Sequence, residues 1–291
     1  METVRTGVIG PGRGRAGFTL VELVMVIAIV GVVAAVAGRF VTQPVAGFLD
    51  VTRRARLVDA ADVALTRLGR EARIAAPNSL RIGAGGRAVE FLRLRTGGRY
   101  RAEPPGSVLS FTSASGSFEF LGELPDLASI RATPGAGVAQ CAANTVDCVL
   151  LYNTGQAGAD AWALDNLAAV QAASAAGITF ARSTPFPLAS PGQRFFVVEG
   201  PVAYLCDLGA GTLRRYSGHT INASQGAVDT HAELLAAGAA SALVADGVSA
   251  CRFDYRAGTA TRGGLLTIAL TIAEAGEQVS LLHQVHVRNV P

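Results

Sequence analysis

The sequence lacks lysine altogether, so all 25 of its basic residues are arginines. We attribute this bias to the base composition of the genome, because even positions expected to face solvent follow it. Only 16% of the residues are charged, and the formal net charge is +3. Such a small charge gives no indication of a nucleic-acid or acidic-lipid partner. With half of its 291 residues apolar, the chain is long enough for one large domain or two small ones.

The familiar motifs of catalysis are also missing. The sequence contains no G-x-S-x-G elbow, no phosphate-binding loop and no H-E-x-x-H pair. Two of its four histidines, His283 and His286, are three apart on an expected strand, so they point to opposite faces and cannot chelate one metal. Asp160 and Asp165 are of the residue type that binds calcium, but two acids in an alanine-rich stretch do not define a site. We therefore expect no enzyme, no cofactor and no metal.

The longest apolar stretch runs from Phe18 to Gly38, and Arg39 closes it. As an α-helix its 21 residues would measure about 31 Å, which matches the roughly 30 Å hydrocarbon core of a membrane. One acid, Glu22, lies inside this stretch, where an ionised side chain costs about 2.5 kcal/mol or more. The stretch is therefore a membrane span that needs a partner for one carboxylate.

The residues just before the span offer that partner. A short basic leader ends in Ala16-Gly17. If the chain is cut after Gly17, Phe18 becomes a new N-terminus, and its α-ammonium lies close to Glu22 of the same chain or of a neighbour. The string GFTLVE, residues 17–22, resembles the N-terminal signal of the type IV pilin and type II secretion pseudopilin superfamily. The resemblance implies that prepilin peptidase cleaves after Gly17 and N-methylates Phe18, and that Glu22 sets subunit register in a filament.

Other interpretations of this segment fit less well. A secretory signal peptide would have a shorter apolar region followed by an A-x-A site, and a generic signal anchor would not need Glu22. Residues 12–17 also spell G-x-G-x-x-G, but a dinucleotide site needs a preceding strand within a βαβ unit, whereas a membrane span follows here. The match to that motif is accidental.

Charge does not settle the orientation of the span. The positive-inside rule keeps Arg13 and Arg15 in the cytoplasm, but arginines also follow the span from Arg39 to Arg56. The cytoplasmic placement of the leader is therefore implied by the resemblance. Removing the leader takes a net +2 from the formal +3 and leaves about +1, so the mature protein is near neutral.

These features predict the domain organisation and the fold class. We expect a cytoplasmic leader over 1–17, a transmembrane helix over 18–39, a periplasmic continuation of that helix over 40–77, and a β-rich periplasmic domain over 78–291. Pro44 lacks a backbone donor and is expected to kink the helix. The class is α+β, a long N-terminal transmembrane and amphipathic helix packed on an antiparallel β-sheet domain, as in pilins.

The continuation of the helix is amphipathic, with an apolar stripe expected to pack on the domain's own sheet. Asp50 with Arg54, and Arg67 with Glu71, stand at i, i+4 and are expected to pair. The positions of the stripe are Val51, Val58, Leu65 and Ala72, with Ala61, Leu68 and Ala75 beside them.

Beyond Pro77 the sequence is typical of β structure. We expect residues 154–177 to form a surface insertion with helix-like spacing around Trp162, and 217–245 to be a long connection. The expected strands are 79–82, 88–95, 99–102, 108–111, 118–121, 149–152, 178–182, 195–199, 202–206, 213–216, 248–255, 265–272 and 278–287.

Four cysteines in a chain carried across a membrane favour disulfides, and three pairings are possible. We favour Cys141 with Cys148, which a local polar loop separates, and Cys206 with Cys251, which would join two strand-like segments. Free buried thiols remain the alternative. Neither spacing suits zinc.

Several further stretches resemble the MshO family of MSHA (mannose-sensitive haemagglutinin) pilus biogenesis proteins, which are minor pilin-like components. The resemblance implies a subunit that primes or caps a surface filament. Residues that carry it are Pro44 to Asp50, Asp59 to Leu65, Pro77 to Ser79, Gly97 to Arg101, Tyr204 and Cys206, Cys251 to Tyr255, and His283 to Pro291.

The resemblance also implies partners and a location. The partners would be other major and minor pilins, prepilin peptidase, the inner-membrane assembly platform and the lipid bilayer, with nucleic acid unfavoured. The protein would be a single-pass inner-membrane protein with a periplasmic domain. Two alternatives stay open, a type II secretion pseudopilin and a tip adhesin or DNA-uptake receptor.

Overall fold

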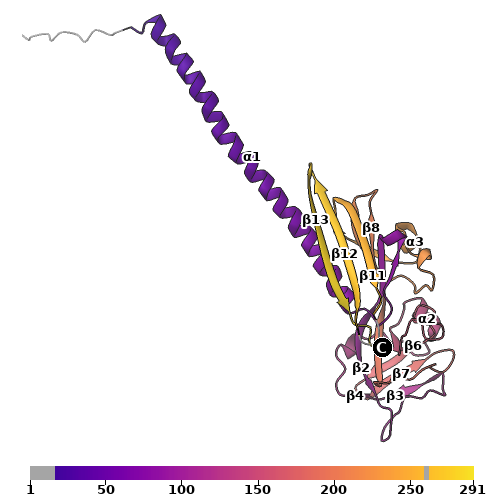
Figure 1. Ribbon diagram of the computed structural model, residues 1–291. Helices are drawn as coiled ribbons and strands as arrows, with labels where there is room; N and C mark the ends of the chain where they lie inside the picture. The colour runs from indigo at the N-terminus through magenta and orange to yellow at the C-terminus, as the bar shows by residue number, and fades with distance from the viewer. Residues whose placement is uncertain (1–16, 259–261) are drawn as a thin grey trace, which may run out of the picture. The chain divides into compact units, whose positions relative to one another are not determined.

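The computed structural model describes residues 17–258 and 262–291, except for the side chains of residues 41–46 and residue 49. The chain divides into two compact units, Met1–Arg53 and Arg54–Pro291. Helix α1, Leu20–Arg73, has 54 residues and contributes to both units (Figure 1). An apolar helix is followed by a large antiparallel β domain, which confirms the α+β class.

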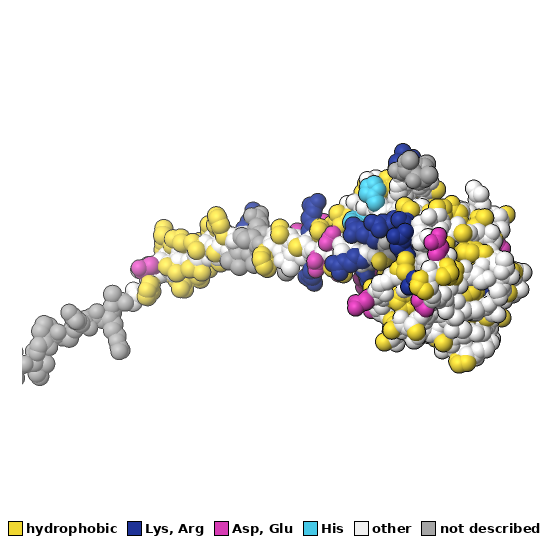
Figure 2. All heavy atoms as spheres, turned by 90° about the horizontal axis from the view of Figure 1, so that it is seen from below, with side chains coloured by type: hydrophobic (Ala, Val, Ile, Leu, Met, Phe, Trp, Pro, Cys, Tyr) yellow, Lys and Arg dark blue, Asp and Glu magenta, His cyan; other side chains and the backbone are white. Residues whose placement is uncertain are grey.

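In the first unit, the described side chains of α1 are exposed as far as Val51, and Thr52 and Arg53 are half-buried. Its segment Leu20–Phe40 has 21 residues, a mean hydropathy of 2.8 and no buried share, which makes it long and apolar enough to cross a membrane. Figure 2 shows hydrophobic side chains covering this part of the helix. Asp50 pairs with Arg53 at 3.3 Å, so the expected pairing with Arg54 is wrong by one position. The helical assignment continues through Pro44, and a kink there stays a prediction.

In the second unit, the last turns of α1 pack into the largest hydrophobic core. The buried positions start at Leu57 and follow the 3.6-residue helical period, whereas Val51 and Val58, both expected on the stripe, are 69% and 41% exposed. A strict seven-residue repeat drifts by about 20° per heptad on a straight helix, so the predicted stripe was out of phase at its start. The buried helix residues are Leu57, Ala61, Ala64, Leu65, Leu68 and Ala72, and Ala75, which follows the end of the helix, is buried in the same core.

The strands of the second unit form two antiparallel sheets. Among the described residues the larger has ten strands, with the path β1-β2-β8-β5-β6-β7-β3, and with β4, β9 and β10 joined to it at β2, β8 and β9. Its strands are β1 Arg81–Gly83, β2 Ala88–Tyr100, β3 Ser115–Phe118, β4 Phe120–Leu121, β5 Cys148–Leu151, β6 Leu167–Ser174, β7 Gly177–Ala181, β8 Arg194–Asp207, β9 Thr212–Ser217 and β10 Ala240–Ala245.

The smaller sheet has the order β11-β12-β13, with β11 Val248–Arg256, β12 Gly264–Glu274 and β13 Glu277–Val287. Alternate residues of β12 from Leu266 to Ile272 are buried, and they face the same core as the helix. That core also takes side chains from β2 and β8 of the larger sheet, among them Phe91 and Tyr204. The end of α1 therefore contacts both sheets.

Both disulfides of the favoured pairing are present. Cys206 of β8 and Cys251 of β11 link the two sheets, with a Cα–Cα distance of 6.3 Å. Cys141 of the short helix α2, Val138–Ala142, and Cys148 of β5 lie 5.9 Å apart at Cα and close a local loop. The described cysteines include no free thiol.

Three expectations about the domain are wrong. Segment 154–177 contains β6 in the middle of the larger sheet, and Trp162 is only 6% exposed, so the segment is not a surface insertion. Segment 217–245 contains helix α3, His231–Ala236, and β10 instead of a plain connection. Residues 108–111 form no strand, although the Leu109 N–H donates to the Arg101 carbonyl and the preceding Ser107 carbonyl accepts from the Glu119 N–H.

Candidate functional site

The predicted cleavage point lies at the exposed start of the described chain. Gly17, Phe18 and Thr19 have no helical or strand assignment, and Phe18 is 79% exposed. Nothing lies within 4 Å of a Cβ placed on Gly17. The Gly17–Phe18 bond is therefore open to an enzyme without any unfolding of α1, although cleavage and methylation at this bond stay predictions.

The helix begins at Leu20, two residues after this bond, and two residues of the signal fix its start. Thr19 precedes the first helical residue and accepts a hydrogen bond from the Glu22 backbone N–H at 3.2 Å, as an N-cap residue does. Thr19 and Glu22 have the T-x-x-E spacing of a capping box. Glu22 also lies in the first helical turn, where the helix dipole favours a negative charge.

Glu22 is exposed and has no ion-pair partner among the described residues. A helix cap stabilises the backbone, but it does not neutralise a carboxylate inside a bilayer. The ammonium group of a cleaved Phe18, from this chain or from a neighbour, would supply the counter-charge that Glu22 lacks among the described residues.

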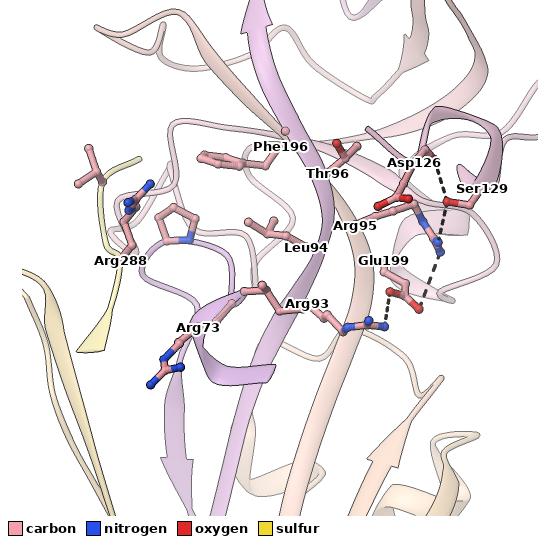
Figure 3. A pocket seen from close by; sticks show the side chains of 15 residues that line it. Arg73, Arg93, Leu94, Arg95, Thr96, Asp126, Ser129, Phe196, Glu199 and Arg288 are labelled. Atoms are coloured by element: carbon pink, nitrogen blue, oxygen red, sulfur yellow. Dashed lines mark hydrogen bonds and ion pairs between the residues drawn. The ribbon is translucent and has the colours of Figure 1, made fainter. Parts of the chain in front are cut away.

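A second candidate site lies in the domain, and sequence reasoning missed it. A cavity of about 750 Å³ opens between the end of α1, β2, β8 and the residues after β13 (Figure 3). Leu94 and Phe196 form an apolar part of its lining, and four arginines surround it, Arg73, Arg93, Arg95 and Arg288. A volume of this size is typical of ligand sites, which combine apolar walls with a few polar groups.

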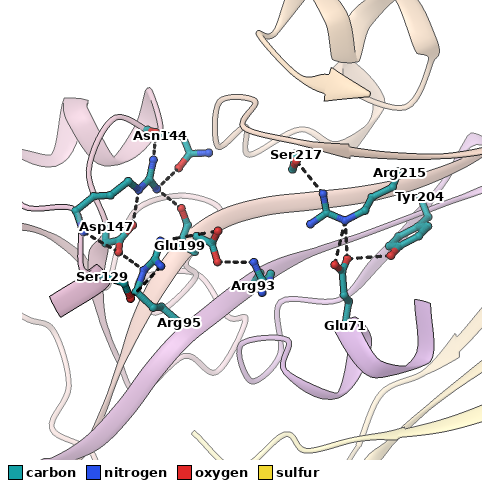
Figure 4. Close-up of polar contacts among 11 residues, drawn as sticks. Glu71, Arg93, Arg95, Ser129, Asn144, Asp147, Glu199, Tyr204, Arg215 and Ser217 are labelled. Atoms are coloured by element: carbon teal, nitrogen blue, oxygen red, sulfur yellow. Dashed lines mark hydrogen bonds and ion pairs between the residues drawn. The ribbon is translucent and has the colours of Figure 1, made fainter. Parts of the chain in front are cut away.

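Two of the cavity arginines belong to an ion-pair network that continues behind the cavity (Figure 4). Arg93 donates to Glu199 at 2.6 Å, and Arg95 donates to the fully buried Asp147. Arg131 donates to the other carboxylate oxygen of Asp147 at 2.7 Å. A buried carboxylate that holds two guanidinium groups is satisfied, so this network fixes β2 and β8 relative to the residue that precedes β5.

A separate polar cluster ties the end of α1 to the larger sheet. Glu71 accepts from Arg215 of β9 at 2.8 Å and from the Tyr204 hydroxyl of β8 at 2.9 Å. Burial raises the pKa of Tyr204, and the nearby Glu71 carboxylate raises it further. The predicted pairing of Glu71 with Arg67 is therefore wrong, because a partner on the sheet is better placed than an exposed one on the helix.

Beneath β1 a third cluster is almost completely enclosed. Glu90 accepts from Arg81 at 2.8 Å and lies 2.9 Å from Nε2 of His219, and both Glu90 and His219 are buried. The Arg81 guanidinium lies over the Trp162 ring, 3.5 Å from its centroid, and burial lowers the pKa of Arg81. Since the cluster is closed to solvent, we assign it to packing.

The described residues contain no group of three histidine, cysteine or acidic side chains that could hold a metal. Asp165 accepts from the backbone of Gly158 at 2.9 Å, and Asp160 accepts from the backbone of Trp162 at 3.0 Å. These acids fix their own loop. His286 is exposed and His283 half-buried on β13, as expected for opposite faces of a strand.

Residues 12–38 match the family described as the prokaryotic N-terminal methylation motif. No curated protein and no solved structure matches the chain. The match covers the end of the leader, the Gly17–Phe18 bond, Glu22 and most of the apolar segment of α1. It supports a type IV pilin-like prepilin signal and, with it, a pilin-like or pseudopilin-like subunit that prepilin peptidase processes. The single apolar helix is consistent with anchoring in the inner membrane.

Proposed function

We propose that this protein is a minor pilin-like subunit that takes part in priming or capping a type IV pilus of the MSHA type. The observation that carries the proposal is the match of residues 12–38 to the N-terminal methylation motif, on a helix joined to an α+β domain. The resemblance of the remaining stretches to the MshO family favours this type of pilus.

In this proposal the N-terminal segment drives assembly. The processed subunit waits in the inner membrane as a single-pass protein, with the domain in the periplasm. On assembly α1 leaves the lipid for a bundle of like helices, where helix packing and an ion pair between Glu22 and a Phe18 ammonium replace the lipid contacts. The partners are other major and minor pilins, the peptidase and the inner-membrane assembly platform.

The proposed role is structural and not enzymatic. The buried ion pairs around Asp147 and Glu90 have their partners within the domain, and the disulfides join its elements. Such a domain suits a subunit that keeps its shape while the helix changes its surroundings.

A type II secretion pseudopilin is the second candidate, because the same N-terminal motif serves pseudopilins. A tip adhesin or DNA-uptake receptor is a more distant third. Genomic neighbours separate the first two, since a pilus cluster would support our proposal and a secretin operon with exoproteins would support the alternative.

The direct test is to purify surface filaments and to identify this chain and its mature N-terminus by mass spectrometry. We expect a small amount of the chain, beginning at an N-methylated Phe18. Filaments that lack the chain, or a chain that begins at Met1 and still functions, would refute the proposal.

A further inference from the structure

Two arginines of the cavity have no acidic partner. Arg73 and Arg288 are exposed, and neither forms an ion pair with another described residue, whereas Arg93 and Arg95 are held by Glu199 and Asp147. Figure 3 shows Arg73 and Arg288 on the side of the cavity away from Glu199. This side of the cavity therefore presents two free positive charges next to an apolar wall.

Two negatively charged side chains without a basic partner in the described chain lie at the β12–β13 turn. Glu274 and Glu277 are direct cross-strand partners, and no cation among the described residues pairs with either. Like charges directly opposite one another destabilise a hairpin. Asp246 is exposed on the adjacent turn, which is joined to β12 by the Ala273 N–H to Gly247 carbonyl bond of 2.8 Å. Cations from outside the domain would relieve this repulsion.

The two charge clusters lie at opposite ends of the smaller sheet. Gly264 pairs with Val287 at one end, next to Arg288, and Glu274 pairs with Glu277 at the other. At about 3.3 Å per residue, β12 separates them by roughly 33 Å. Since the sheet is continuous, the acidic turn of one chain cannot reach its own cavity, but it can reach the cavity of another chain.

The shape of the turn also fits. Its tip, Ala275-Gly276, adopts positive φ at both positions and carries almost no side chain, so the turn is narrow. We propose that Glu274 and Glu277 of one copy of this chain dock at Arg73 and Arg288 of a second copy. The contact joins different surfaces, so repeating it produces a head-to-tail array.

A nucleic acid is a less suitable occupant of the same cavity. A phosphate backbone carries a charge at every nucleotide and is bound through several cations, whereas Arg93 and Arg95 of this cavity are already held by Glu199 and Asp147. The two carboxylates of the narrow turn, in contrast, are matched in number by the two arginines that have no acidic partner among the residues described. The contact uses the domain alone, so it does not depend on cleavage at Gly17 or on the type of filament.

The test uses the full-length chain in detergent and two variants that each carry one added cysteine beside the native disulfides, Ala275→Cys at the turn and Val290→Cys at the cavity. Both positions are exposed and uncharged. Mixing the two variants under mild oxidation should give a disulfide-linked dimer that neither variant gives alone. Raising the salt from about 0.05 to about 0.5 M should reduce its yield, because the charges are screened.

Charge reversal makes the test specific. Glu274→Arg with Glu277→Arg on the first variant, or Arg73→Glu with Arg288→Glu on the second, should each lower the yield about tenfold or more, since like charges then meet. Combining both reversed partners should restore the yield. The control reverses Arg252, an exposed arginine in the middle of β11 that pairs with Ala269 of β12, and should leave the yield unchanged.

Three results would overturn the proposal. The first is the absence of a cross-link between the unreversed partners, and the second is a yield that does not respond to reversal or is not restored by the combined reversal. The third is binding of a fluorescent single-stranded oligonucleotide that Arg73→Glu with Arg288→Glu abolishes, since the cavity would then serve a nucleic acid. None of these results bears on processing at Phe18, so failure here is distinct from failure of the proposed function.

Discussion

Glu71 of α1 and Arg215 of β9 form an ion pair between the helix and the larger sheet, with Nε 2.8 and 3.0 Å from the two carboxylate oxygens. Their side chains are only 18% and 15% exposed, so little water competes for the contact. The Tyr204 hydroxyl shares the same carboxylate. The pair therefore fixes the position of the helix end on the domain.

We expect Glu71→Gln to lower the free energy of unfolding of the domain by about 1–3 kcal/mol, because it leaves Arg215 partly buried without a counter-charge. Denaturant unfolding of the full-length chain in detergent, followed by the fluorescence of the only tryptophan, Trp162, measures this change. Asp50→Asn, which breaks an exposed ion pair on the same helix, is the matched control and should cost less than about 0.5 kcal/mol. Equal effects of the two variants would contradict our account.

Substitution of Glu22 should separate membrane insertion from assembly. Glu22→Ala and Glu22→Gln remove the one acid of the span, so the protein should stay in the membrane fraction but be lost from filaments. Membrane fractionation and immunoblotting of sheared filaments provide the measurement. Met25→Leu, an apolar exchange one turn further along the helix, should leave both properties intact. Normal incorporation of the Glu22 variants would count against an ion pair with the Phe18 ammonium.

Substitution of Gly17 should block processing. Gly17→Ser, or a charged residue at this position, should leave the leader attached, and intact mass spectrometry should show an excess equal to residues 1–17. Gly31→Ala is the control, because its added Cβ meets nothing within 4 Å and it lies away from the cleavage point. A Gly17 variant with a mature mass would refute cleavage at this bond.

The two disulfides should differ in their contribution to stability. Chain-entropy arguments give about 4 kcal/mol for the link between Cys206 and Cys251, 45 residues apart, and about 2.5 kcal/mol for Cys141 and Cys148, seven apart. Double Cys→Ala variants of each pair, unfolded by denaturant, test this order. A larger loss from the shorter loop would show that the entropy of the unfolded chain does not control how much each disulfide stabilises the domain.

Alkaline pH should destabilise the domain through its buried tyrosines. Burial raises the pKa of Tyr100, Tyr204, Tyr216 and Tyr255 in the folded protein. Because the folded pKa exceeds the ordinary value of about 10, this stability is complete below that pH and is lost as the pH rises beyond it.

The measurement is the absorbance of tyrosinate during an alkaline titration, together with unfolding at each pH. Four of the five tyrosines should ionise above the ordinary value. Tyr204→Phe should cost about 1 kcal/mol at neutral pH and remove one late-titrating group. If Tyr100, Tyr204, Tyr216 and Tyr255 ionise near pH 10 while the protein stays folded, the prediction fails.

The sequence predicted the elements that follow from the pattern of apolar and polar residues within one short segment. The apolar helix and the C-terminal hairpins follow from hydropathy and alternation, and they agree with the structure. The favoured disulfide pairing agrees with it as well. The start of the apolar stripe was misplaced at Val58 because seven-residue spacing only approximates the helical period.

What the sequence could not predict depends on distant partners. Trp162 lies in an alanine-rich stretch without a strong period, and its buried position depends on residues distant in the sequence, among them Arg81 over its ring and the Ser79 carbonyl, which accepts from its indole N–H. Glu71 pairs with Arg215 and not with the neighbouring Arg67, because the sheet lies against the helix there. The cavity collects residues from several separate parts of the chain, and no local motif joins them.

The covalent link between β8 and β11 has a mechanical consequence. The end of α1 contacts both of the sheets that Cys206 and Cys251 join, and the backbone after the helix bonds directly to β2. Tension applied along the helix axis would therefore act in shear on many contacts at once, and it would not peel them apart one by one. An oxidised domain should withstand a pull on its helix that a reduced one would not.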